Sequence, residues 1–145
     1  MHYFDTAFLV RLYLPDPGWE IVRAFVQTVT EVPAACIHAR FETVAALHRA
    51  LWEGRMNAAE FSALLDQFEK DCAGGKFKWL PISDGVTARL STSFRALPAT
   101  VFLRAADALH LACAAEHGFV EIYSNDARLP AAAPHFGIRG VNIIP

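Results

Sequence analysis

Four acidic residues, Asp5, Glu42, Asp107 and Asp126, stand beside apolar residues, where an isolated charge is costly. Asp107 is the clearest case, because it is the only charged residue in the alanine- and leucine-rich run 105–109. Burying an unpaired carboxylate costs several kcal/mol unless something neutralises it. We therefore expect these acids to serve a site.

The chemistry of such a site follows from its donor atoms. Four carboxylates in one cleft would repel one another, and a shared proton, a nearby base or a divalent cation relieves that repulsion. Oxygen donors without His or Cys ligands favour Mg²⁺ or Mn²⁺ over zinc. These ions support phosphoryl transfer by activating water and by neutralising charge on the phosphodiester. The acids therefore favour a phosphate substrate.

Strands that alternate with helices must position these acids. Short apolar runs predict strands at His2–Asp5, Glu31–Ile37, Phe77–Ile82, Phe119–Ser124 and Ile138–Ile144. Helical spacing predicts helices at Thr6–Leu14, Ile21–Val29, His38–Trp52, Asn57–Cys72, Val86–Leu97 and Phe102–His117. This alternation is typical of one α/β domain over residues 1–145, with a mostly parallel sheet. In the helix at His38–Trp52, a stripe that includes Phe41, Leu51 and Trp52 predicts the buried face.

The predicted topology places two of the acids directly. Ligands of parallel α/β sheets bind outside the carboxyl ends of the strands. Asp5 and Asp126 follow predicted strands at that edge, and the helices after the strands can bring Glu42 and Asp107 there.

The composition limits the classes of protein to consider. The chain has 145 residues, a net charge of −2 and 54% hydrophobic residues, which excludes a disordered chain. Its three cysteines form no CxxC pair and suit reduced thiols, and no signal peptide or membrane span is visible, so we expect a soluble cytoplasmic protein. Setting aside the −4 of the four acids leaves +2 on the other residues, so a nucleic-acid partner is compatible with the net charge.

Five segments together resemble the PIN-domain family. They are residues 3–7 (Tyr-Phe-Asp-Thr-Ala), residues 9–13 (Leu-Val-Arg-Leu-Tyr), residues 40–42 (Arg-Phe-Glu), residues 104–112 (Arg-Ala-Ala-Asp-Ala-Leu-His-Leu-Ala) and residues 124–129 (Ser-Asn-Asp-Ala-Arg-Leu). The resemblance spans the chain and is closest to the VapC-type ribonuclease toxins of type II toxin-antitoxin systems. It implies a three-layer α/β/α sandwich.

The resemblance also implies roles for individual residues. All four acids would be catalytic. Asp5, Asp107 and Asp126 would bind Mg²⁺ or Mn²⁺, Glu42 would complete the acidic pocket as a further metal ligand, and Thr6 and Ser124 would support it by hydrogen bonding. The implied activity is endoribonuclease cleavage of tRNA or rRNA. The implied partners are a small antitoxin protein and a second copy of the chain in a homodimer.

Basic residues near the motifs leave two alternatives open. Arg11, Arg40, Arg104 and Arg128 either contact RNA phosphates or pair with the acids. The chain also departs from the family in two places. Ser124 stands where the family often has threonine, and Pro130 and Pro134 interrupt the helix that usually follows the last motif.

Each acid also has a purely structural interpretation. Asp107 can pair with Arg104 or His110, and Glu42 can be a solvated residue near a helix N-terminus. Asp5 can cap the helix that begins near Thr6, and Asp126 can cap a turn. The six histidines show no metal-ligand spacing, so we expect core or surface roles for most of them and no zinc site.

Two other functions compete with the ribonuclease. A catalytically idle PIN-like module would keep the pocket and bind only a partner. A receiver-like phosphoacceptor domain needs paired acids after the first strand and a late lysine. Asp5 stands alone and no lysine follows Lys78, so this function is less favoured.

Overall fold

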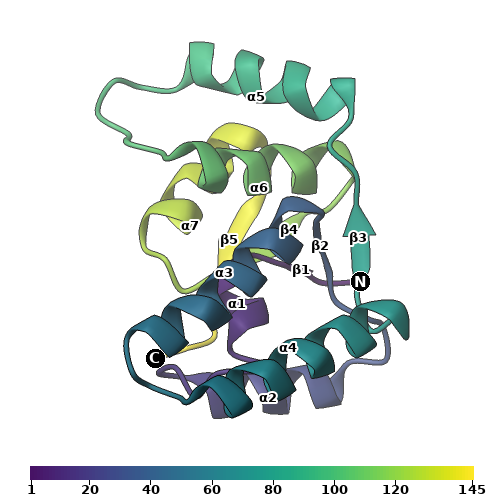
Figure 1. The fold of residues 1–145 in the computed structure, drawn as a ribbon. Coiled ribbons are helices and arrows are strands. Elements are labelled where there is room, and N and C mark those ends of the chain that lie inside the picture. The colour runs from purple at the N-terminus through teal and green to yellow at the C-terminus, as the bar shows by residue number, and fades with distance from the viewer.

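The protein, described here over all residues 1–145 by a computed structural model, is built on a five-stranded parallel sheet (Figure 1). The strands are β1 (Tyr3–Phe4), β2 (Ala34–Cys36), β3 (Lys78–Leu80), β4 (Glu121–Tyr123) and β5 (Arg139–Val141). Their order in the sheet is β3-β2-β1-β4-β5, and every neighbouring pair is parallel. Each strand lies inside the range that the sequence predicts and is shorter than that range.

Seven α-helices connect or follow the strands. They are α1 (Thr6–Val10), α2 (Trp19–Thr28), α3 (His38–Trp52), α4 (Ala58–Ala73), α5 (Asp84–Ala96), α6 (Ala105–Glu116) and α7 (Arg128–Ala132). The capping box at α4 forms as expected, because the Asn57 side chain accepts from Glu60 N at 2.9 Å and the Glu60 carboxylate accepts from Asn57 N at 2.7 Å. Helix α1 is shorter than predicted and ends at Val10.

The helices form two layers, one on each face of the sheet, which confirms the three-layer sandwich. Alternate residues of β1 enter different cores: Tyr3 packs with α5, α6 and the 3₁₀ helix η1 (Ala133–Phe136), whereas Phe4 packs with α1, α2, α3 and α4. Figure 1 shows α5, α6 and α7 on one side of the strands and α2 and α4 on the other. No helix in the fold combines the length and the apolar character needed to cross a membrane.

The buried face of α3 differs from the predicted one. The helix buries Ala39, Thr43, Leu47 and Ala50, whereas Phe41 and Trp52 are 66% and 80% exposed. The prediction followed the largest apolar side chains. Ala39 and Ala50 are small and let α3 pack closely against its neighbours. With this face of α3 buried, Glu42 lies beside α1 and α6.

The interruption predicted at Pro130 and Pro134 is also wrong in part. Pro130 lies in the first turn of α7, where a missing N–H breaks no intrahelical bond, and α7 continues to Ala132. Pro134 lies in the first turn of η1, which extends the helical path to Phe136. The backbone of Pro130 packs against Gly140 in β5.

This close approach makes a stability prediction. Gly140→Ala would place a Cβ against the backbone of Pro130, so α7 must move away from β5. We expect a loss of about 1–3 kcal/mol in the free energy of unfolding, measured by urea denaturation. The control is Val120→Ala, because Val120 is 76% exposed and its truncation should change stability by less than about 0.5 kcal/mol. Equal stability of the two variants would contradict the packing described here.

Candidate active site

The four predicted acids line one cleft of about 460 Å³. The cleft lies at the carboxyl ends of β1 and β4, the two adjacent strands from which the chain order runs in opposite directions across the sheet. Such a switch point is where parallel α/β sheets bind ligands. Asp5 follows β1, Asp126 follows β4, Glu42 comes from α3 and Asp107 comes from α6.

Asp5 forms the buried floor of the cleft. Its side chain is nearly inaccessible, and its Oδ1 accepts a hydrogen bond from Phe8 N at 2.9 Å, so it also caps α1. Burial raises the pKa of Asp5 above its ordinary value, against the opposing effects of His110 and of a hydrogen bond to Ser124. The capping interpretation of Asp5 is therefore correct, and it fixes the carboxyl group in the cleft.

Glu42 is held by three groups that favour its charge. Thr6 donates its hydroxyl proton to Glu42 Oε2, and the Nε2 atoms of His38 and His110 lie 3.3 and 3.5 Å from the same oxygen. Burial alone would raise the pKa of Glu42, but these neighbours outweigh it and lower the pKa well below its usual range. Glu42 is therefore an ionised carboxylate.

Asp107 and Asp126 share one cation. Arg104 donates from Nε to Asp107 Oδ2 and from Nη2 to Asp126 Oδ2, both at 3.2 Å. The Asp126 backbone N–H donates to Ser124 Oγ at 3.0 Å, and Asp126 Oδ1 accepts from Arg128 N at 2.7 Å. The ion pair and the turn cap expected as structural alternatives are thus present, and neither removes the acids from the cleft.

Two histidines belong to the site although no metal-ligand spacing in the sequence marks them. His110 is buried, with Nε2 3.0 Å from Thr6 Oγ1 and Nδ1 3.1 Å from the Tyr3 hydroxyl. The His38 ring lies against it, with 4.3 Å between the ring centroids. One sequence feature could have indicated His38 as a site residue. It precedes Glu42 by four residues on one helix, so the two side chains share a face.

Asp16 also lines the cleft and was not predicted. It lies in the loop after α1 and forms an ion pair with Arg55. Nothing in the sequence around Pro15 and Pro17 marks Asp16 as a site residue.

The carboxylates suit a divalent cation. Asp5, Asp107 and Asp126 offer only oxygen atoms, which matches the donor preference of Mg²⁺ and Mn²⁺. The Arg104 guanidinium between Asp107 and Asp126 shows that this pair already attracts positive charge.

The predicted phosphate contacts fall in different environments. Arg11 is buried and donates to the carbonyls of Ala7 and Pro17, at 2.7 and 2.8 Å. The other three arginines, Arg40, Arg104 and Arg128, are exposed. Of these, Arg104 lines the cleft, and Arg40 and Arg128 do not.

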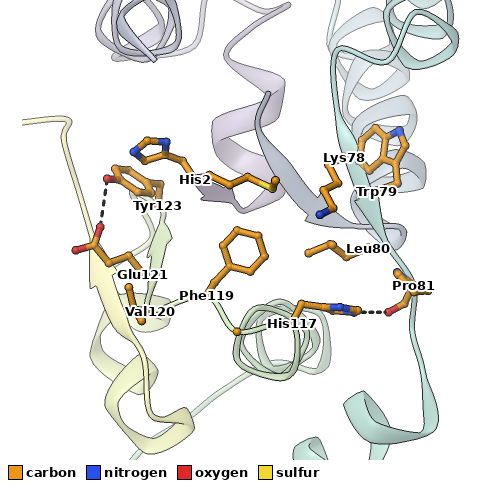
Figure 2. A pocket seen from close by; sticks show the side chains of 12 residues that line it. His2, Lys78, Trp79, Leu80, Pro81, His117, Phe119, Val120, Glu121 and Tyr123 are labelled. Atoms are coloured by element: carbon orange, nitrogen blue, oxygen red, sulfur yellow. Dashed lines mark hydrogen bonds between the residues drawn. The ribbon is translucent and has the colours of Figure 1, made fainter. Parts of the chain in front are cut away.

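A larger hollow of about 590 Å³ lies away from these acids (Figure 2). It is lined by β3 and by residues that precede β1 and β4, such as Trp79, His2 and Phe119. Its only acid, Glu121, is engaged by Arg139 and by the Tyr123 hydroxyl. With no convergent charges, this hollow is not the candidate active site.

Comparison with known proteins agrees with the fold. The family model described as PIN domain matches residues 2–133. The FitAcB structure from Neisseria gonorrhoeae is 20% identical, with a TM-score of 0.78, and the match covers 98% of this chain and 97% of that one. No curated protein matches the chain significantly in sequence.

Two further solved structures share the fold. VapC20 of Mycobacterium tuberculosis, described as a sarcin-ricin loop cleaving toxin, is 16% identical with a TM-score of 0.70, over 91% of this chain and 95% of that one. VapBC2 of Rickettsia felis, bound to a promoter DNA fragment, is 14% identical with a TM-score of 0.68, over 98% of both chains.

The raised pKa of Asp5 predicts a pH-dependent gain in stability for Asp5→Asn. Protonated Asp5 stabilises the fold below its ordinary pKa of 3.8, and this contribution is lost as the pH rises through the raised folded-state value. Asn keeps an uncharged cap oxygen at all pH values. At pH 7 in EDTA we expect a melting temperature about 2–4 °C higher for each kcal/mol gained.

The gain should shrink as the pH is lowered towards about 4, where the wild-type carboxyl is protonated. Asp66→Asn is the control, because Asp66 is exposed on α4 and outside the cleft. An equal rise in the melting temperature of Asp5→Asn at pH 7 and at about pH 4 would contradict our explanation that burial of the Asp5 carboxylate causes the gain.

Proposed function

The chain belongs to the PIN domain family, and from this premise we propose that it is a metal-dependent endoribonuclease, the toxin of a toxin-antitoxin pair. The observation that carries the proposal is the convergence of Asp5, Glu42, Asp107 and Asp126 from four separate elements on one cleft at the sheet switch point.

The proposed roles follow the geometry of the cleft. Asp5, Asp107 and Asp126 would hold Mg²⁺ or Mn²⁺, which when bound activates water and neutralises charge on the phosphodiester. Glu42, ionised and held by Thr6, completes the negative pocket. Ser124 orients Asp126 through the backbone N–H that donates to its hydroxyl.

RNA is the proposed substrate, and exposed arginines would contact its phosphates. Arg104 lies at the cleft and its side chain is 56% exposed, so it can donate to a phosphate beside the acids. Arg40 and Arg128 would extend this contact. We assign Arg11 to holding α1 and the following loop together, because its Nε and Nη1 donate to backbone carbonyls.

The substrate class and the partners rest on the structural neighbours. VapC20 is described as cleaving the sarcin-ricin loop, which favours structured RNA such as rRNA or tRNA. A solved structure described as a toxin-antitoxin complex from Klebsiella pneumoniae shares the fold, with 18% identity and a TM-score of 0.65, which favours a small antitoxin partner. The exposed side chains of Phe41, Trp52 and Phe102 are apolar surface of the kind that partners cover, and we propose a homodimer as well.

An idle interaction module is the second candidate. Arg104 already neutralises Asp107 and Asp126 in part, so the cleft can persist without a metal ion. Calorimetry with Mn²⁺ separates the two functions, because an idle module would release or absorb no heat of metal binding.

The nuclease proposal predicts loss of activity in carboxylate variants. With Mn²⁺, wild-type protein should cleave tRNA or rRNA fragments, and EDTA should abolish cleavage. Asp107→Asn should lower the rate by at least about 100-fold, because charge stabilisation in the cleft is lost. Asp66→Asn, outside the cleft, should stay within about twofold of wild type. Equal cleavage by wild type in EDTA or by Asp107→Asn would overturn the mechanism.

The partner proposal predicts two assemblies. Light scattering of the purified chain should give twice the 16.0 kDa protomer mass. Co-expression with a small protein encoded beside this chain should give a stable complex in which RNA cleavage is suppressed. A monomeric mass would contradict the homodimer, and full cleavage by the co-purified complex would contradict the antitoxin.

A further inference from the structure

Two imidazoles and one carboxylate meet at one end of the candidate active site. One ligand atom from each of His38, Glu42 and His110 lies within 4.8 Å of the other two. The residues come from α3 and α6, and His110 and Glu42 also line the cleft. This cluster adds nitrogen donors to a cleft whose other acids offer only oxygen.

The separations between the donors suit a tetrahedral ion. The Nε2 atoms of His38 and His110 lie 3.3 and 3.5 Å from Glu42 Oε2. Charge-assisted hydrogen bonds are shorter, at about 2.7–2.9 Å. In a tetrahedral site with bonds of about 2.0–2.1 Å, neighbouring donors are about 3.3–3.4 Å apart. The two separations from Glu42 Oε2 match the second geometry, and the histidine nitrogens lie within 4.8 Å of each other.

The histidines are also arranged as ligands require. Both ring nitrogens of His38 are buried and have no hydrogen-bond partner, although Glu42 is near. Tyr3 oxygen accepts from Cys36 N at 3.1 Å and lies 3.1 Å from His110 Nδ1. Without an ion, Thr6 gives its hydroxyl proton to Glu42, so His110 carries its proton on Nε2 and donates it to Thr6 Oγ1. An ion at Nε2 would displace this proton, and the Tyr3 oxygen would then accept a proton carried on Nδ1. A histidine ligand is commonly oriented by such a second hydrogen bond.

We propose that His38, Glu42 and His110 form a binding site for a borderline transition-metal ion, Zn²⁺ or the similar Co²⁺, separate from the oxygen site formed by Asp5, Asp107 and Asp126. Imidazole nitrogen suits these ions better than Mg²⁺. Three protein ligands leave a fourth position, and the Thr6 hydroxyl, which contacts both Glu42 and His110, lies beside it.

The two sites would compete for Glu42. An ion at the histidines draws this carboxylate out of the acidic pocket, so Zn²⁺ should inhibit Mn²⁺-dependent cleavage. This consequence rests on the proposed nuclease function, whereas the binding site itself does not.

The test is direct metal binding by the full chain, without RNA. Metal-free protein is titrated with Co²⁺ and followed by visible absorbance, and Zn²⁺ is then added to displace the Co²⁺. We expect one equivalent of Co²⁺ with nitrogen-ligand absorption bands. His38→Gln should weaken binding at least about 10-fold to 100-fold, as loss of supporting groups at metal sites already does.

Matched variants separate the two sites. His117→Gln should bind Co²⁺ as wild type does, because His117 lies outside the cleft, with Nε2 3.1 Å from the Pro81 carbonyl oxygen. Asp126→Asn should keep the Co²⁺ bands and lose Mn²⁺ affinity. His38→Gln should lose the Co²⁺ bands and keep Mn²⁺ affinity. Circular dichroism verifies folding, and His110→Gln replaces His38→Gln as the ligand variant if the latter does not fold, because Glu42 belongs to both sites.

Two results would overturn the proposal: unchanged Co²⁺ affinity in the folded ligand variant, or loss of the bands in Asp126→Asn but not in that variant. Co²⁺ binding with the expected variant pattern, in a chain that cleaves no RNA, would retain this metal site and reject the nuclease. RNA cleavage without Co²⁺ binding would do the opposite.

Discussion

Repulsion among carboxylates is the constraint around which this cleft is built. Asp5, Glu42, Asp107 and Asp126 approach one another at the one sheet edge where the topology leaves a crevice, and each has its own compensation. Arg104 bridges two of them, a helix N-terminus holds the third, and Thr6 donates to Glu42 with two imidazoles nearby. These compensations differ in kind. Arg104 is exposed and can move, so the ion pairs at the mouth of the cleft can rearrange. Asp5 is buried and accepts from the backbone N–H of Phe8, so the position of its carboxyl group at the floor is fixed.

Strands of two or three residues are sufficient to position the site, because the side chains of β1 connect both cores to it. Tyr3 enters one core and its hydroxyl reaches Cys36 N and His110, while Phe4 enters the other core. Asp5 follows at once, so its position is set by two buried aromatic rings and by the first turn of α1. The stability of the sheet and the geometry of the site therefore have the same origin. The burial that orders Asp5 also raises its pKa, which means that an ionised Asp5 destabilises the fold that positions it.

Much of this arrangement could be predicted from local sequence, and the failures have physical causes. Acids that follow strand ends, and acids beside apolar residues of helices, predict Asp5, Glu42, Asp107 and Asp126, which line the cleft, but not Asp16. The face of α3 was wrong because close packing favoured Ala39, Thr43 and Leu47 over the larger Phe41 and Trp52, and size alone does not indicate which face has room. The contact between His38 and His110 joins helices far apart in the chain, so no spacing rule reports it.

Glu42 joins the oxygen donors of the cleft to its nitrogen donors, and this position gives its surroundings their significance. An acid placed only to bind a hard cation needs oxygen neighbours, yet Glu42 Oε2 faces two imidazoles and a hydroxyl. The same groups that lower its pKa keep it ionised without any metal, so the pocket does not depend on an ion to hold its charge. Glu42 would be a ligand in both proposed ion sites. Because one carboxylate cannot fully satisfy both, its engagement with the oxygen ligands or with the histidines would determine whether the cleft favours a hard or a borderline cation.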